Sequence, residues 1–244
     1  MQRLHRLDLP ANILTRLEQE QSLVIDQHSA GTLDIDKQWK SVRQTKTLTS
    51  VLAVLQRMTG VRERCMYCVD SHGSDIEHFR PKKIYPEHAF QWPNMLLCCT
   101  ECGRFKGSQF PIARGQPLLI DPSSEDPWQH LDFDPDTGNL TARFHVPLDA
   151  WSERGSTTVS VLKLDQREAV AAGYQRGFRR LADIVRTQLD TGTVQAQSLF
   201  DTLSQADDHG LLGWCFGDTG KTIAPFLELC QRHPAEWDFC RHLL

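Results

Sequence analysis

The first 60 residues place apolar side chains at the spacing of α-helices. Residues 12–17 show this pattern and predict a first helix. Aspartate is a favoured N-cap, so a second helix is expected to begin at Asp34 or Asp36 and to continue through residue 58. It should end near Gly60, and the region 1–60 is therefore predicted to be mostly helical.

The pattern changes between residues 61 and 135, where eight prolines occur. Proline removes a backbone donor and clashes with the preceding helical turn, so long helices are excluded here. The apolar run 118–120 before Asp121 and Pro122 predicts a short strand that ends in a turn. Two further strands, at 130–133 and 140–144, flank a turn sequence and predict a hairpin.

Helical spacing returns after residue 146. A long helix is predicted at 165–189, and two short helices, 224–232 and 235–244, are separated by a proline. The arginines of the long helix are most simply a solvated face, with a phosphate-binding track as the alternative. These patterns predict an α+β, mainly helical protein in three regions, which are 1–60, 61–145 and 146–244.

Composition indicates a globular protein without a membrane segment. Of 244 residues, 40% are hydrophobic and 24% are charged, and no window reaches the roughly 18 apolar residues of a membrane helix. Arg3, Arg6 and Asp8 interrupt any signal-peptide core, so a cytoplasmic location is expected. The net charge of −4 argues against a nucleic-acid coat protein, although basic residues outnumber acidic ones by eight to six between 62 and 114.

Cysteine provides the strongest chemical signal. A chain in a reducing compartment is not expected to form disulfides, yet five of its eight cysteines fall between residues 65 and 102. Cys65 and Cys68 form one C-x2-C pair, and Cys99 and Cys102 form a second. Two such knuckles predict a closed four-thiolate zinc site with a structural role, in which the spacing favours Cys99 over its neighbour Cys98.

A carboxylate and an imidazole stand side by side between the two knuckles. Glu77 and His78 lie in a short apolar segment that predicts a strand, where adjacent side chains point to opposite faces. One of them could hold a hard divalent cation while the other faces a substrate. The simpler alternatives are an ion pair of Glu77 with Arg80 or Lys82, and a hydrogen-bonded structural histidine. Asn94, after a proline, could be an ordinary turn residue.

The order of these motifs resembles the HNH endonucleases. It consists of C-x2-C, the segment I-E-H-F-R-P-K at 76–82, W-P-N-M-L-L at 92–97, and a second C-x2-C that is followed by a lysine and F-P. Within that family the chain most resembles the PtuB-like HNH subunits of Septu-type and retron-associated anti-phage systems. The resemblance covers about residues 60–135, and the flanking helices match loosely.

The resemblance implies a ββα-metal fold, a hairpin and one helix around a single divalent ion, with a zinc knuckle as buttress. Glu77 would ligate the catalytic Mg²⁺ or Mn²⁺, and His78 would be the general base that deprotonates water. Asn94 would orient His78 through a side-chain hydrogen bond. The four cysteines would bind structural Zn²⁺. Backbone phosphates of the nucleic acid would be contacted by Arg80, Lys82, Lys83 and Lys106.

One position departs from the family pattern. A metal-binding His or Asn usually follows the last knuckle cysteine, and this chain has Gly103 there. Either Glu77 holds the cation with waters and phosphate, or another group such as Asp75 or His88 substitutes, or the site is weak or inactive. The last possibility keeps open a non-catalytic zinc-knuckle adaptor that binds nucleic acid or protein.

The family relation also implies a substrate and a partner. DNA is the usual substrate of HNH enzymes, and a structured RNA such as tRNA is the alternative among the retron-linked relatives. The implied partner is an ABC-type or OLD-like ATPase of the PtuA class that controls the nuclease. The chain contains no phosphate-binding loop of the G-x4-G-K-[ST] type that would let it serve as that ATPase itself.

Overall fold

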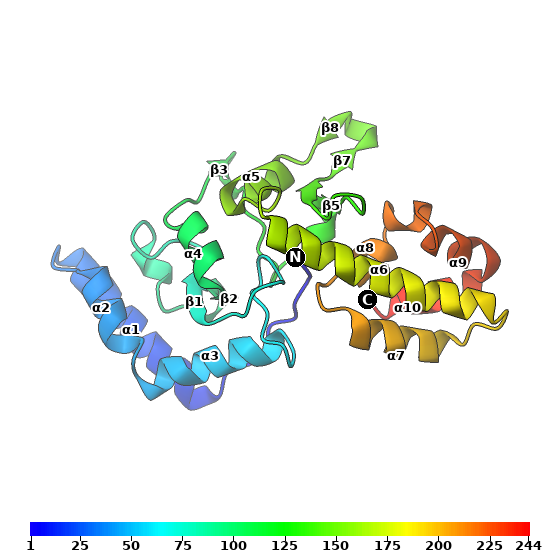
Figure 1. Ribbon diagram of the computed structural model, residues 1–244. Helices are drawn as coiled ribbons and strands as arrows, with labels where there is room; N and C mark the ends of the chain where they lie inside the picture. Colours follow the sequence, from blue (N-terminus) through cyan, green and yellow to red (C-terminus); the bar gives the residue numbers. More distant parts are fainter. The chain divides into compact units, whose positions relative to one another are not determined.

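The computed structural model describes residues 1–244 and divides them into two compact units (Figure 1). One unit comprises Leu4–Glu125. The other comprises Met1–Arg3 together with Asp126–Leu244. The N-terminal helices therefore belong to the same unit as both cysteine knuckles, whereas the hairpin that we assigned to the central region belongs to the other unit.

The unit Leu4–Glu125 contains four helices and two small sheets. Its helices are α1 (Ala11–Ser29), α2 (Ile35–Val42), α3 (Lys46–Met58) and α4 (Thr100–Lys106). Strands β1 (Asp75–His78) and β2 (Met95–Cys98) pair in antiparallel fashion, as do β3 (Ile112–Ala113) and β4 (Gln116–Pro117). Helix α3 contacts β2 through an apolar face, which covers the central hairpin with buried side chains of Leu48, Val51, Val54 and Leu55.

Two sequence predictions are wrong in this unit. The single helix expected up to residue 58 is two helices, because Thr45 is extended and caps the carbonyl of Val42 with both its N–H and its hydroxyl. The strand expected at 118–122 does not form. Its backbone is held instead by single contacts, such as Leu118 N–H to Pro111 O and Asp121 N–H to the Glu125 carboxylate.

The second unit is built on the long helix α6 (Glu168–Asp190), whose buried face includes Tyr174, Phe178 and Leu181. The hairpin β5 (Leu131–Phe133) and β6 (Leu140–Ala142) confirms the prediction for this segment, and α5 (Glu153–Leu162) contacts β6. The remaining elements are β7 (Phe144–His145), β8 (Ala150–Trp151), α7 (Ala196–Ala206), α8 (Leu212–Cys215), α9 (Phe226–Arg232) and α10 (Pro234–His242).

The predicted fold class is confirmed. Helices dominate both units, and every sheet is a two-stranded antiparallel pair, so the protein is α+β and mainly helical. The predicted helices at 165–189, 224–232 and 235–244 correspond to α6, α9 and α10 with ends that differ by at most three residues. None of the helices combines the length and apolarity that crossing a membrane requires.

Candidate active site

Four cysteine thiols converge inside the unit Leu4–Glu125. The Sγ atoms of Cys65, Cys68, Cys99 and Cys102 all lie within 4.8 Å of one another, and all four side chains are buried. Thiolates bound to one zinc ion at about 2.3 Å lie about 3.8 Å apart, close to the 3.9 Å between Cys68 Sγ and Cys99 Sγ. The donor set and its geometry therefore fit a tetrahedral zinc ion with no open coordination position.

Backbone hydrogen bonds fix the first knuckle against strand β2. Met66 N–H donates to Leu97 O at 2.9 Å, and Ser74 N–H donates to Cys98 O at 3.1 Å. Within the knuckle, Val69 N–H donates to Cys65 O at 2.9 Å, and Val69 lies in the left-handed region at φ 48°. The four-cysteine cluster and the β1–β2 hairpin are thus one structural piece.

The second knuckle starts helix α4. Cys99 is its N-cap and accepts a hydrogen bond from Cys102 N–H at 3.4 Å. Cys98 is the last residue of β2, and its thiol is not part of the group of four but donates to Cys99 O at 3.2 Å. The structure therefore selects Cys99 as the ligand, as the two-residue spacing predicts.

Glu77 and His78 lie on β1 and are followed, through β2, by α4. Glu77 pairs with Leu96 and His78 pairs with Met95 in the antiparallel register. Because neighbouring residues of a strand face opposite sides, the carboxylate and the imidazole leave the hairpin in different directions. A hairpin followed by one helix is the local arrangement that the family resemblance implies.

His78 is buried, and one ring nitrogen is held firmly. Nε2 lies 2.9 Å from the carbonyl oxygen of Ala89. A carbonyl can only accept, so Nε2 carries the proton and Nδ1 keeps a free lone pair. The hydrogen bond of this ring is formed by Nε2 and not by Nδ1. Burial lowers the pKa of His78 to about 3, with smaller contributions from the positive charges of Lys82 and Lys106, so the ring is neutral at physiological pH.

Asn94 does not form the hydrogen bond to His78 that the resemblance implies. Its Oδ1 accepts from Arg80 N–H at 2.7 Å, and its Nδ2 donates to the carbonyl oxygens of Arg80 at 3.1 Å and His88 at 2.9 Å. All of these bonds go to the loop that connects β1 to β2. Since that loop carries Ala89, Asn94 positions His78 indirectly, by fixing the segment whose carbonyl holds the ring.

Glu77 is bonded to a lysine that is fully buried. Lys106, the last residue of α4, donates from Nζ to Glu77 Oε1 at 2.8 Å and to His78 O at 2.7 Å, and its side chain is 0% exposed. Burial raises the pKa of the Glu77 carboxyl, and Lys106 opposes that rise. Lys106 thus neutralises Glu77 inside the unit, and its ammonium is not available to an external phosphate in this arrangement.

The other carboxylate oxygen of Glu77 faces Gly103. A Cβ placed on Gly103 would lie 3.7 Å from Glu77 Oε2 and 3.7 Å from Cys98 Sγ. A longer side chain at this position would therefore reach the Glu77 carboxylate, and glycine leaves that space without a ligand. The four cysteines are the one group of three or more His, Cys, Asp or Glu side chains whose ligand atoms could hold one ion, so Glu77 does not belong to a protein ligand set of that size.

The residues considered as substitutes for the missing ligand have other partners. Asp75 pairs with Arg43 at 3.5 Å, and His88 bonds Gln91 through Nδ1 at 2.8 Å. His72, next to the first knuckle, pairs with Glu63 at 3.8 Å. A divalent cation at Glu77 would have one carboxylate from the protein and would keep most of its waters, which Mg²⁺ accepts when phosphate oxygens complete its shell.

The remaining basic residues lie beside the hairpin and have partners of their own. The Arg80 guanidinium lies over the rings of Tyr85 and Phe110, at 5.8 and 5.6 Å from their centroids. Lys82 and Lys83 both bind the carboxylate of Asp36, at 2.9 and 2.7 Å. Their ammonium groups are therefore close together and already hold one anionic group.

Helix α2 is the part of the site that sequence reasoning missed. Besides Asp36, it contributes Trp39, whose ring lies 4.3 Å from that of His78 in an edge-to-face arrangement. Asp36 and Trp39 are about one helical turn apart, so they share a face of α2. No local motif marks them, and their spacing on a predicted helix is the single signal that could have suggested a common surface.

Curated proteins with similar sequences are named Septu protein PtuB. That of Bacillus mycoides (strain KBAB4) is 32% identical over 151 residues, which are 49% of this chain and 48% of the relative. That of Bacillus thuringiensis is 31% identical over 108 residues, 42% of this chain and 37% of the relative. The chain spans less than half the length of these relatives. No family model matches the chain. The similarity supports a relationship to the PtuB proteins of Septu systems.

The metal centre gives a first testable prediction. We expect purified protein to contain one zinc ion per chain, measured by inductively coupled plasma mass spectrometry, and Cys99→Ser to lose it because three thiolates bind zinc less tightly. Cys98→Ala, one residue away, is the matched control and should retain the metal. Loss of zinc in Cys98→Ala with retention in Cys99→Ser would contradict the assignment.

The buried ion pair gives a second prediction. Lys106→Met leaves the Glu77 carboxylate buried without its partner, and we expect the free energy of unfolding in urea to fall by about 3 kcal/mol. The double variant Glu77→Gln/Lys106→Met removes both charges and should recover a large part of that loss. If the two single changes simply add, Lys106 and Glu77 are not coupled and the pairing is wrong.

Proposed function

We propose that this chain is a nuclease of the HNH type that hydrolyses phosphodiester bonds in nucleic acid, with DNA as the favoured substrate and RNA, including tRNA, as the alternative. The observation that carries the proposal is the state of His78. Its Nε2 proton is held by a backbone carbonyl and its Nδ1 keeps a lone pair, beside a carboxylate on a hairpin buttressed by four thiols. A neutral imidazole fixed in this way presents a lone pair that can accept a proton from water.

In this proposal each residue has a definite task. His78 accepts the proton of the attacking water at Nδ1, while the Nε2–H bond to Ala89 O holds the ring and stabilises the imidazolium that forms. Asn94 maintains the loop that carries this carbonyl. Lys82 and Lys83 are placed to bind the phosphate. The four-thiolate zinc site keeps the hairpin and α4 together and takes no part in the chemistry.

Glu77 is the residue that would hold Mg²⁺ or Mn²⁺. Its Oε2 atom faces Gly103, whereas Oε1 is bound by Lys106. When bound, such a cation acts as a Lewis acid that stabilises negative charge on the phosphate and the leaving oxygen. The positive charge of Lys106 offsets the negative charge of Glu77, so we expect Glu77 to bind the cation weakly in the absence of nucleic acid.

The similarity to Septu protein PtuB supports a biological setting. We propose that the chain acts in an anti-phage defence system of the Septu type, with an ATPase of the PtuA class as its controlling partner. A separate ATPase is consistent with the lack of a G-x4-G-K-[ST] loop in this chain. Co-purification with the product of a neighbouring ATPase gene tests the partner, and its failure would count against it.

A non-catalytic adaptor is the second candidate, and one observation favours it. Gly103 offers no ligand, and the ammonium of Lys106 already neutralises Glu77. In that case the knuckles would present a binding surface to nucleic acid or to a protein, and no hydrolysis would occur. A divalent ion bound at Glu77 in addition to zinc would argue against the adaptor.

The test is cleavage of plasmid DNA and of total cellular RNA by the purified protein, alone and with its co-expressed ATPase partner. We expect cleavage with Mg²⁺ or Mn²⁺, none with EDTA, and a loss of at least about 100-fold in His78→Ala because the general base is removed. His72→Ala, which removes an exposed histidine outside the site, should cleave as wild type does. Undiminished cleavage by His78→Ala would refute the mechanism, and no cleavage under any condition would favour the adaptor.

A further inference from the structure

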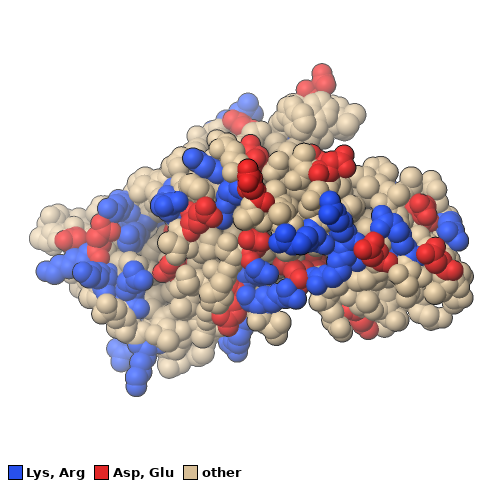
Figure 2. Space-filling model, viewed as in Figure 1, with Lys and Arg blue, Asp and Glu red and all other residues tan.

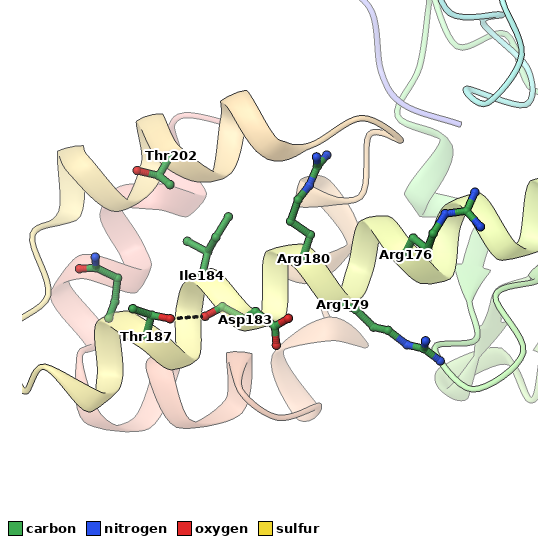
Figure 3. Close-up of a pocket in the computed structure, with 8 residues that line it drawn as sticks. Arg176, Arg179, Arg180, Asp183, Ile184, Thr187 and Thr202 are labelled. Carbon is green, nitrogen blue, oxygen red and sulfur yellow. Dashed lines mark hydrogen bonds between the residues drawn. The ribbon is translucent and has the colours of Figure 1, made fainter.

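Helix α6 carries a row of exposed arginines along a groove in the unit that contains residues 126–244. Arg176, Arg179 and Arg180 line one side of this groove, which has a volume of about 530 Å³ and reaches Thr202 on α7. Figure 3 shows all three side chains on α6, with Arg180 directed towards the space between α6 and α7 and Arg179 extending from the opposite side of the helix. On the face drawn in Figure 2, Lys and Arg side chains gather along α6.

Two of these arginines have no acidic partner. Arg176 and Arg179 are exposed and form no ion pair, whereas Arg180 binds Asp208 and the carbonyl of Ala206. Farther along the helix, Arg186 neutralises Asp183 at 2.6 Å. Because acidic residues outnumber basic ones in this unit, unpaired guanidinium groups on one helix face are not a consequence of a generally basic surface.

We propose that the α6 groove, defined by Arg176, Arg179 and Arg180, binds the phosphodiester backbone of a nucleic acid. Side chains three and four positions apart on a helix lie side by side, so these guanidinium groups can contact neighbouring phosphates. Guanidinium donors match phosphate oxygens in a bidentate geometry, and such contacts do not depend on base sequence. The identification of the ligand rests on the proposed nuclease function, but binding can be measured without cleavage.

The test is binding of fluorescein-labelled duplex DNA and duplex RNA of one sequence, in EDTA, followed by fluorescence anisotropy over a range of salt concentrations. We expect Arg176→Glu/Arg179→Glu to weaken binding of the preferred duplex at least about tenfold and to reduce the slope of log affinity against log salt by about two. Arg232→Glu, an exposed arginine on α9, is the charge-matched control and should bind within about twofold of wild type.

Each outcome of this experiment is decisive. Equal affinities of the double variant and the Arg232→Glu control, or no binding of either duplex by wild type, would overturn the proposal. Binding without any cleavage in the plasmid and RNA assay would leave the α6 groove established while the nuclease function fails. The preferred duplex identifies DNA or RNA as the source of the phosphates.

A second inference comes independently from helix α2, which covers the Glu77–His78 strand. Three side chains contact the site, two from one side of this helix and one from its C-cap residue. Asp36 binds Lys82 and Lys83, Trp39 packs its ring edge against His78, and Arg43 pairs with Asp75. His78, the proposed base, has little access to solvent, at 6% exposure.

The attachment of α2 is weak. The helix has eight residues, and Val42 is its single buried residue. A helix of this length is not stable without tertiary contacts, and ion pairs at exposed positions contribute little to stability. Asp36 is about half exposed in its pairs with Lys82 and Lys83, and so are both members of the Arg43–Asp75 pair. Such an element is expected to open locally without unfolding the unit.

We infer that α2 is a displaceable cover and that Asp36 occupies the place of a substrate phosphate. A phosphate that binds Lys82 and Lys83 takes the partners of Asp36, and release of Asp36 allows Trp39 to leave His78. Substrate binding and exposure of the base are thereby coupled. The inference rests on the proposed role of His78, but its test measures access and not cleavage.

The test uses the full chain with Asp36→Asn, which removes the charge that holds both lysines. We expect hydrogen exchange of residues 35–42 and modification of His78 by diethyl pyrocarbonate, both read by peptide mass spectrometry, to increase about three- to tenfold. Lys40→Gln, a charge change at an exposed and unpaired position of the same helix, is the control and should leave both rates unchanged.

A second variant separates the ion pairs from the aromatic contact. Trp39→Leu keeps the helix and removes the ring, so the rate at which diethyl pyrocarbonate modifies His78 should rise. Hydrogen exchange of the four cysteines and of α4 should stay as slow as in wild type. Asp36→Asn and Trp39→Leu proteins in which His78 reacts at the wild-type rate would overturn the inference, because α2 would then not limit access to the base.

Discussion

Four thiols must meet at one point, and the geometry of the candidate site depends on this requirement. Cys68 and Cys99 are 31 positions apart in the chain, yet their sulfur atoms lie 3.9 Å from one another. Bringing the knuckles together places the first against β2 and starts α4 directly after it. A zinc ion that binds these thiols contributes on the order of 10 kcal/mol to folding, comparable to the whole stability of a domain. The ion would therefore determine where Glu77 and His78 lie.

If His78 is the base that we propose, the interactions around the hairpin both orient it and bury it. The Ala89 carbonyl fixes the tautomer of His78, and Asn94 fixes the loop that carries this carbonyl. Lys106 compensates the buried charge of Glu77 from within the unit. Helix α2 then closes over the imidazole. A preorganised but covered group suits a protein whose activity is released only when substrate or partner binds, and on our proposal the arginines of α6 would hold the nucleic acid separately.

The sequence predicted those features of the structure that a short local motif determines. Two C-x2-C spacings predicted the thiol cluster and the choice of Cys99, and the strand that carries Glu77 and His78 was found from its local pattern. Helical periodicity located most helices, and the error at Thr45 arose because one threonine can cap a turn inside an otherwise continuous apolar pattern. The similarity to PtuB proteins agrees with the recognition of these motifs.

The parts of the site that were missed depend on contacts between distant segments. Lys106 was expected at phosphates and instead lies buried on Glu77, 29 residues away. Asn94 fixes backbone groups rather than the imidazole, because its loop folds back on it. Asp36 and Trp39 reach the site from a helix about 40 residues upstream. A sequence pattern specifies which face of an element is apolar, but it does not specify which distant side chain will lie there.

The central claim is that the four-thiolate metal centre holds the Glu77–His78 hairpin in place. Hydrogen exchange of the full chain before and after removal of metal with a zinc chelator tests it directly. The account predicts that exchange accelerates strongly across residues 65–106, including both strands of the hairpin, while α6 in the other unit keeps its protection. Unchanged protection of 75–98 in metal-free protein would contradict the account, because the hairpin would then be held by packing alone.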